Sequence, residues 1–188
     1  MADLVALFRR NIDRCSEVVG GIGDDDWSKP TPCSDWDVRE LLNHLTGEQL
    51  WAPHLVAGET IAQVGDRYDG DVLGDDPQAT WRSAVPPSVA AFAEPGALDG
   101  TVHLSYGDES CREYLTQMLT DAAVHGWDLA RAVGADERID PEAASLLLGH
   151  WREREDMVRG SGIFGEAVEV GDDADDQAKL LALLGRRP

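Results

Sequence analysis

Apolar residues recur at helical spacing along much of this chain. In the opening segment, residues 2–19, the apolar side chains fall three or four residues apart, at Leu4, Phe8, Ile12, Cys15 and Val19. Side chains at that spacing share one face of an α-helix. The pattern predicts an amphipathic helix that packs on a core, with Cys15 as part of the packing.

A second helix is predicted by its capping residues as well as by its periodicity. Asp37 precedes the periodic run and Glu40 follows three residues later, which is the arrangement of a capping box. We expect this helix to run to about residue 57, before Gly58, and to be kinked at Pro53. Its apolar stripe contains Leu41, Leu45, Ala52 and Leu55.

The middle of the chain contains strong turn signals. Residues 58–76 are polar and rich in glycine, so we expect a long surface loop. Asp76 and Pro77 are a suitable cap and first residue for a third helix. Pro86 and Pro87 are expected to break or bend that helix, because proline removes a backbone donor.

The C-terminal half is also mainly helical by pattern. One short extended piece is predicted where polarity alternates, and three helices are predicted from periodicity and caps. These elements are an extended piece at residues 101–106, then helices at residues 110–133 before Gly134, 141–158 after Asp140, and 174–184 before Gly185. Long helices with long connections indicate an all-α helical bundle.

Size and charge narrow the range of functions. The 188 residues suit one domain covering residues 1–188. A formal net charge of -20 repels phosphate backbones and anionic lipid headgroups, so we expect neither nucleic-acid nor membrane partners. The three cysteines lack C-x-x-C spacing, and no apolar run has the length of a membrane span or the form of a signal peptide. A cytoplasmic protein is the resulting expectation.

Three metal-ligand side chains lie beside the apolar stripes of two predicted helices. Asp121 and His125 are four residues apart and therefore neighbours on one helix face, where they can offer an oxygen and a nitrogen to one point. His44, at the edge of the stripe of the second helix, is the best candidate for a third ligand. Three N and O ligands leave a coordination position open, as in catalytic zinc sites. The alternative is that these residues are hydrogen-bonded groups of the core.

Two more acidic residues stand near these candidates. Glu48 is one turn beyond His44, and Asp128 lies close to Asp121 and His125. Either could orient an imidazole or move a proton. The alternatives are a surface salt bridge for Glu48 and, for Asp128, a local ion pair with Arg131 or Arg112.

Three runs of sequence resemble a known family. The runs are WSKPTPCSDWDVRELLNHLTGE, DAAVHGWDLARAVG, and FGEAVEV followed by LLALLGRRP. They are similar to the mycothiol-dependent maleylpyruvate isomerase N-terminal family, within the DinB/YfiT-like metal-binding superfamily. The resemblance implies a DinB-like four-helix bundle that holds a divalent metal, usually zinc, with His44, Asp121 and His125 as ligands.

The resemblance has two departures that bear on the reaction. The isomerase pattern has Glu where this chain has Asp121, and we expect no separate C-terminal domain such as the isomerase carries. Maleylpyruvate isomerisation is therefore not carried over.

The leading hypothesis is a zinc-dependent transferase or isomerase that uses a thiol, mycothiol, on a small electrophile; Ni²⁺ or another first-row metal is an alternative to zinc. The competing hypothesis is a non-catalytic metal-binding or sensing bundle. A homodimer is a weaker expectation from related bundles.

Overall fold

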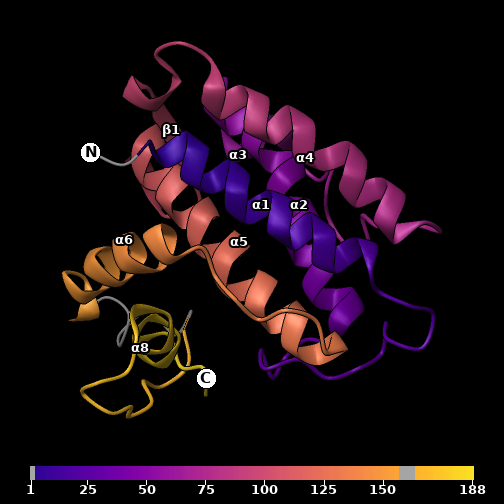
Figure 1. Ribbon diagram of the computed structural model, residues 1–188. Helices are drawn as coiled ribbons and strands as arrows, with labels where there is room; N and C mark the ends of the chain where they lie inside the picture. Colours follow the sequence, from indigo (N-terminus) through magenta and orange to yellow (C-terminus); the bar gives the residue numbers. More distant parts are fainter. Residues whose placement is uncertain (1–2, 157–163) are drawn as a thin grey trace.

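Long amphipathic helices make up most of the computed structural model, which describes residues 3–156 and 164–188 (Figure 1). Helix α1 (Leu4–Gly20) packs on α5 (Cys111–Val133) and on α4 (Pro77–Ala93), whereas α2 (Val38–Val56) packs on α4 and α5. The fully buried side chains between them include Phe8, Leu45, Trp81, Leu115 and Met118. The mainly helical architecture predicted from periodicity is confirmed, with a small two-stranded sheet added.

The predicted helix ends are confirmed where a capping residue marked them. The Asp37 side chain accepts a hydrogen bond from the backbone N–H of Glu40, and the Glu40 side chain accepts one from the backbone N–H of Asp37. These two hydrogen bonds form the capping box of α2. Ser110 caps α5, and Gly134 ends it with a φ of 73°, in the left-handed region that glycine adopts without strain.

Two predictions about breaks in the chain are wrong in part. The expected loop over residues 58–76 contains a short helix, α3 (Ile61–Val64), which begins at a second capping box formed by Thr60 and Gln63. Pro86 and Pro87 lie within α4 and do not end it. Both prolines are exposed, and the residues around them bury one face of the helix, so packing outweighs the lost backbone hydrogen bonds.

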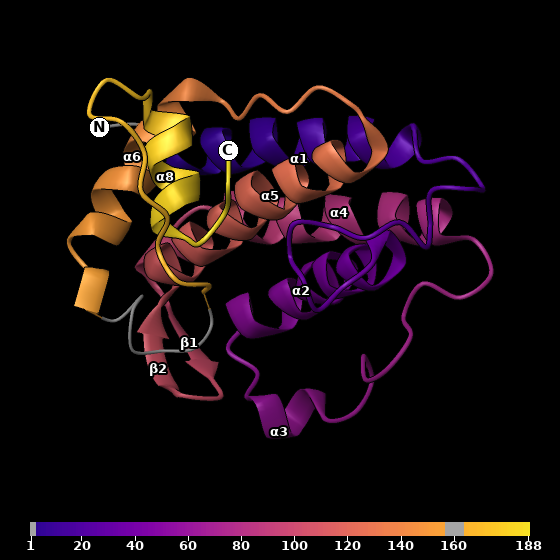
Figure 2. The ribbon, with the colours of Figure 1, turned by 90° about the horizontal axis from the view of Figure 1, so that it is seen from below.

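A β-hairpin takes the place of the single extended piece expected at residues 101–106. Strand β1 (Thr101–Leu104) pairs antiparallel with β2 (Gly107–Ser110), with Val102 opposite Glu109, and a 3₁₀ turn (Ala97–Asp99) precedes them. The sequence of β2 is polar throughout and carries no alternation, so periodicity could not identify it. The hairpin lies at the end of the molecule near α3 (Figure 2).

The last two described helices cover one side of the molecule. Helix α6 (Pro141–Arg152) packs on α8 (Asp176–Leu183), and α6 also contacts α5 and α1 (Figure 2). The predicted end of α6, at residue 158, falls outside the described residues. After α8 the chain turns at Gly185, whose φ is 81°. The backbone of Gly165 is so close at this point that a Cβ atom on residue 185 would lie 2.6 Å from it.

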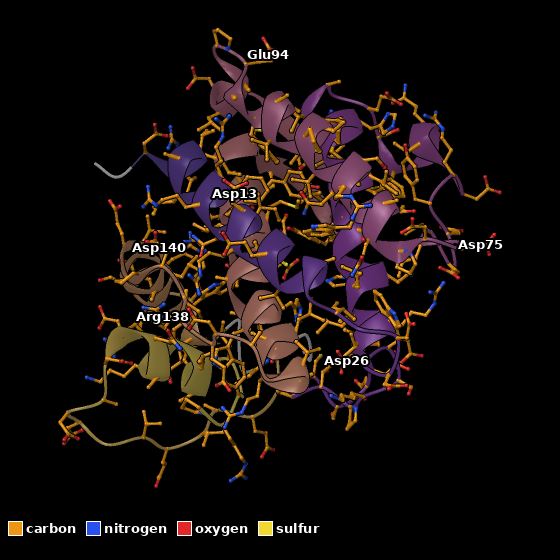
Figure 3. The ribbon with its side chains drawn as sticks, turned by 45° about the vertical axis from the view of Figure 1, so that its right-hand side comes forward. Asp13, Asp26, Asp75, Glu94, Arg138 and Asp140 are labelled. Atoms are coloured by element: carbon orange, nitrogen blue, oxygen red, sulfur yellow. The ribbon has the colours of Figure 1, made fainter. Side chains whose placement is uncertain are left out.

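Acidic side chains are spread over the surface. Figure 3 shows Asp75 and Glu94, which lie just before and just after α4, at the outer edge of the molecule. Within residues 3–156 and 164–188, none of the helices combines the length and the apolar character needed to cross a lipid bilayer.

Candidate metal centre

His44, Asp121 and His125 meet where α2 packs on α5. Each residue offers one ligand atom, and these atoms all lie within 4.8 Å of one another. The Nε2 atom of His44 is 3.8 Å from Oδ2 of Asp121, and the Nε2 atom of His125 is 3.9 Å from Oδ1 of Asp121. The structure thus brings together the three residues that the sequence singled out.

The spacing of these atoms suits a shared cation. Distances of 3.8 and 3.9 Å are too long for direct hydrogen bonds, so the carboxylate is bonded to neither imidazole. Two nitrogens and an oxygen around one point are instead a donor set that zinc and other first-row divalent metals accept. The three residues could therefore hold a metal ion.

The centre is partly shielded from solvent. The side chain of His125 is 11% exposed, whereas those of His44 and Asp121 are 27% and 31% exposed. Burial lowers the pKa of His44, although the Asp121 carboxylate opposes that shift. A lowered pKa keeps the imidazole of His44 neutral at physiological pH, and the neutral form is the one that ligates metals.

Trp36 packs directly on the centre from the loop before α2. Its ring stacks on His44 with centroids 4.7 Å apart, and it lies tilted against His125 at 5.8 Å. The Trp36 carbonyl accepts a hydrogen bond of 2.8 Å from the Thr31 hydroxyl, which holds the loop. The indole therefore restricts the orientations of the His44 ring.

Asp128 is fully buried and joins His125 to the C-terminal segment. Its Oδ2 atom lies 3.0 Å from Nδ1 of His125 and 2.9 Å from Nη2 of Arg186. The local ion pair with Arg131 or Arg112 considered from the sequence is absent from the described ion pairs. Instead, the partner is 58 residues further along the chain, beyond the reach of any local pattern.

Glu48 lines a cavity of about 300 Å³ that borders Asp121. Burial raises the pKa of the half-buried Glu48 carboxyl to about 8, and the Asp121 carboxylate adds to the shift. Tyr114 lines the same cavity, and its buried hydroxyl has no hydrogen-bond partner among the described residues. The other walls combine polar side chains with the apolar side chains of Trp51, Leu55, Ile61, Leu104 and Met118.

A second cavity, of about 580 Å³, is also bordered by Asp121. Asp121, Gln117 and Tyr106 line both cavities, and the Tyr106 hydroxyl donates to the Gln117 side chain over 2.8 Å. The wall of the second cavity also contains Thr120, Trp151, Arg154 and Phe164. Two cavities of different size therefore meet beside the candidate metal centre.

The other histidines lie in other clusters. His54 contacts Glu59 and Tyr68, and His103 contacts Asp108 across the hairpin. His150 lies 3.1 Å from a Glu113 oxygen.

Comparison with known proteins places the chain in a family. The model of the mycothiol maleylpyruvate isomerase N-terminal domain matches residues 8–130. Two uncharacterized proteins of Mycobacterium tuberculosis, from strains CDC 1551 and H37Rv, are each 30% identical to this chain over 146 residues. Each match covers 76% of this chain and 74% of the relative. No solved structure matches the chain significantly.

Proposed function

This chain belongs to the mycothiol maleylpyruvate isomerase N-terminal domain family, and we propose that it is a metal-dependent enzyme that uses a low-molecular-weight thiol, mycothiol, to transfer or isomerise a small electrophile. The observation that carries the proposal is the cluster of His44, Asp121 and His125, in which Asp121 borders two cavities. A transferase needs room for two reactants beside one centre, and this arrangement supplies it.

The proposed ligands are His44, Asp121 and His125, and the proposed metal is zinc, with Ni²⁺ or another first-row metal as the alternative. A divalent cation held by these residues would supply positive charge that lowers the pKa of a thiol. Asp128 would orient His125, because its carboxylate accepts from the ring nitrogen that does not face Asp121.

The smaller cavity is proposed as the site of the electrophile. Its walls combine apolar and polar side chains, which suits a small molecule with an apolar body and a polar group, and we propose Glu48 and Tyr114 as hydrogen-bond partners for one oxygen of that molecule. Burial, the main cause, raises the pKa of Glu48 to about 8 in the metal-free protein, and we propose that this buried carboxyl is the proton donor of the site. The larger cavity, with polar and aromatic walls, is proposed for the thiol co-substrate.

Two broader assignments belong to the same proposal. The packing of α1, α2, α4 and α5 supports a four-helix bundle of the DinB/YfiT-like type. The three cysteines are unpaired, which supports a reducing, cytoplasmic location.

The test is a turnover assay with mycothiol and a panel of neutral electrophiles, run on zinc-loaded and chelator-treated protein. We expect turnover that needs both the thiol and the metal, is lost in His125→Ala, and survives in His103→Ala, a histidine in a different cluster. Stoichiometric metal binding without turnover of any electrophile would reject the enzymatic proposal and favour a sensing or interaction role.

A further inference from the structure

The C-terminal segment after α8 reaches the candidate metal centre through one side chain. Arg186 is only 7% exposed although it lies in the segment beyond the last helix. Its Nη2 atom lies 2.9 Å from Oδ2 of Asp128, and its Nε atom lies 3.3 Å from the same oxygen. The Asp128 oxygen in turn lies 3.0 Å from Nδ1 of His125.

The backbone around Arg186 is held in place by several independent contacts. The Arg186 N–H donates to the Leu181 carbonyl over 2.8 Å, and its Nη1 atom donates to the Leu184 carbonyl over 3.0 Å. Arg131 of α5 donates to the carbonyl of Arg187 over 3.1 Å. The guanidinium is therefore presented to Asp128 from a fixed position. Figure 2 shows the C-terminal segment that follows α8, and its contact with Arg131 places it beside α5.

The chain of contacts determines which nitrogen of His125 faces the centre. Arg186 has only N–H donors, so the Asp128 carboxylate that pairs with it acts as an acceptor. Its Oδ2 atom accepts from Nη2 of Arg186 and also from Nδ1 of His125. An imidazole whose Nδ1 carries the hydrogen presents an unprotonated Nε2, and Nε2 is the atom directed at Asp121. Such outer contacts to a ligand histidine tune the affinity of a metal site.

We infer that Arg186 is a positioning residue of the metal centre: through Asp128 it fixes the tautomer and orientation of His125. The inference rests on the proposed function for the role of His125 as a ligand. Arg186 lies outside residues 8–130, to which the family model applies, so the centre depends on a segment that the family match does not contain.

The test compares Arg186→Met with Arg187→Met, a control at the next position whose contact with Arg131 uses only the backbone carbonyl. Zinc affinity is measured by competition with a chelator, and the His125 tautomer by ¹⁵N NMR of the imidazole nitrogens in the metal-free protein. We expect Arg186→Met to weaken zinc binding by about 10–100-fold and to shift His125 toward a mixture of tautomers. Arg187→Met is expected to change neither.

A second variant separates positioning from folding, because Arg186→Met leaves Asp128 buried without its cationic partner. In Asp128→Leu/Arg186→Met both members of the pair become apolar, a change that such pairs often tolerate. This variant is expected to fold and still to lose zinc affinity and the Nδ1–H tautomer.

Two results would overturn the inference. One is zinc affinity within about twofold of wild type in a folded double variant; the other is an unchanged His125 tautomer in both variants. If the wild-type protein bound no zinc, the proposed function would fail, while the NMR measurement would still decide the role of Arg186.

Discussion

Tyr114 lines the smaller cavity, and its buried hydroxyl has no hydrogen-bond partner among the described residues. A buried polar group without a hydrogen bond costs about 1–3 kcal/mol, and a ligand oxygen in the cavity would remove that cost. The neighbouring Glu48 carboxyl is shielded enough that its pKa is raised to about 8. These two residues are the structural basis for the proposed electrophile pocket.

Tyr114→Phe is expected to have opposite effects on stability and activity. Loss of the unpaired hydroxyl should leave the free energy of unfolding of the ligand-free protein unchanged or raise it by about 1 kcal/mol. Loss of one hydrogen bond to substrate should lower kcat/KM about tenfold. Urea unfolding and steady-state kinetics measure the two effects, and a variant with wild-type kcat/KM would remove Tyr114 from the substrate site.

The cysteines should differ sharply in reactivity. Burial raises the pKa of Cys15 to about 12 and also raises that of Cys111, and both side chains are 1% exposed. Cys33 is only half-buried, although burial raises its pKa too. We expect Ellman's reagent to modify one thiol quickly in the native protein, and Cys33→Ser to abolish that phase. Fast modification of all three thiols in the absence of denaturant would contradict the burial of Cys15 and Cys111.

At the scale of elements, predictions from the sequence succeeded where a local signal decides the structure. Asp37 with Glu40 and Gly134 mark helix ends through contacts with nearby backbone, so the ends of α2 and α5 could be predicted closely. The prolines of α4 are a local signal for a helix end, but tertiary packing outweighs it. The sequence of β2 carries no local signal for a strand, because this strand forms through its pairing with β1.

The start of α6 offers a test of such a local signal. The Asp140 side chain accepts from the backbone N–H groups of Glu142 and Ala143, and Arg10 of α1 donates to it over 2.7 Å. Figure 3 shows Asp140 near the start of this helix. Asp140→Ala should lower the free energy of unfolding by about 1 kcal/mol through loss of the cap, and Asp140→Asn, which still caps, should lower it less.

Asp140 should also make the free energy of unfolding depend on pH in the acid range. The hydrogen bond from Arg10 is the main cause that lowers the pKa of Asp140 in the folded protein. The stabilisation is therefore present above the carboxyl's pKa in the unfolded chain and is lost as pH falls through its lower pKa in the folded state. Urea unfolding between neutral pH and about pH 2 measures this effect. The free energy of unfolding should fall less with decreasing pH in Asp140→Asn than in wild type, and an equal fall in the two proteins would contradict this account.

Across the whole molecule, the sequence indicated the residues of the candidate centre and two acidic neighbours, Glu48 and Asp128, but not the more distant contacts and the cavities. His44, Asp121 and His125 could be selected because helical spacing places them beside apolar stripes, and because the family resemblance pointed to the same positions. Arg186 could not be selected, since its contact with Asp128 joins residues 58 positions apart. The cavities likewise arise from the packing of α2, α5 and the hairpin, which no single segment encodes.

The most direct test of the central claim is the metal content of the purified protein, measured by elemental mass spectrometry before and after reconstitution with zinc. We expect about one ion per chain in wild type and in His103→Ala, and loss of that ion in both His44→Ala and His125→Ala. A bound ion should also raise Tm, because it binds the folded state alone. Wild-type protein without metal after reconstitution, or both alanine variants with undiminished metal, would contradict a metal centre at His44, Asp121 and His125.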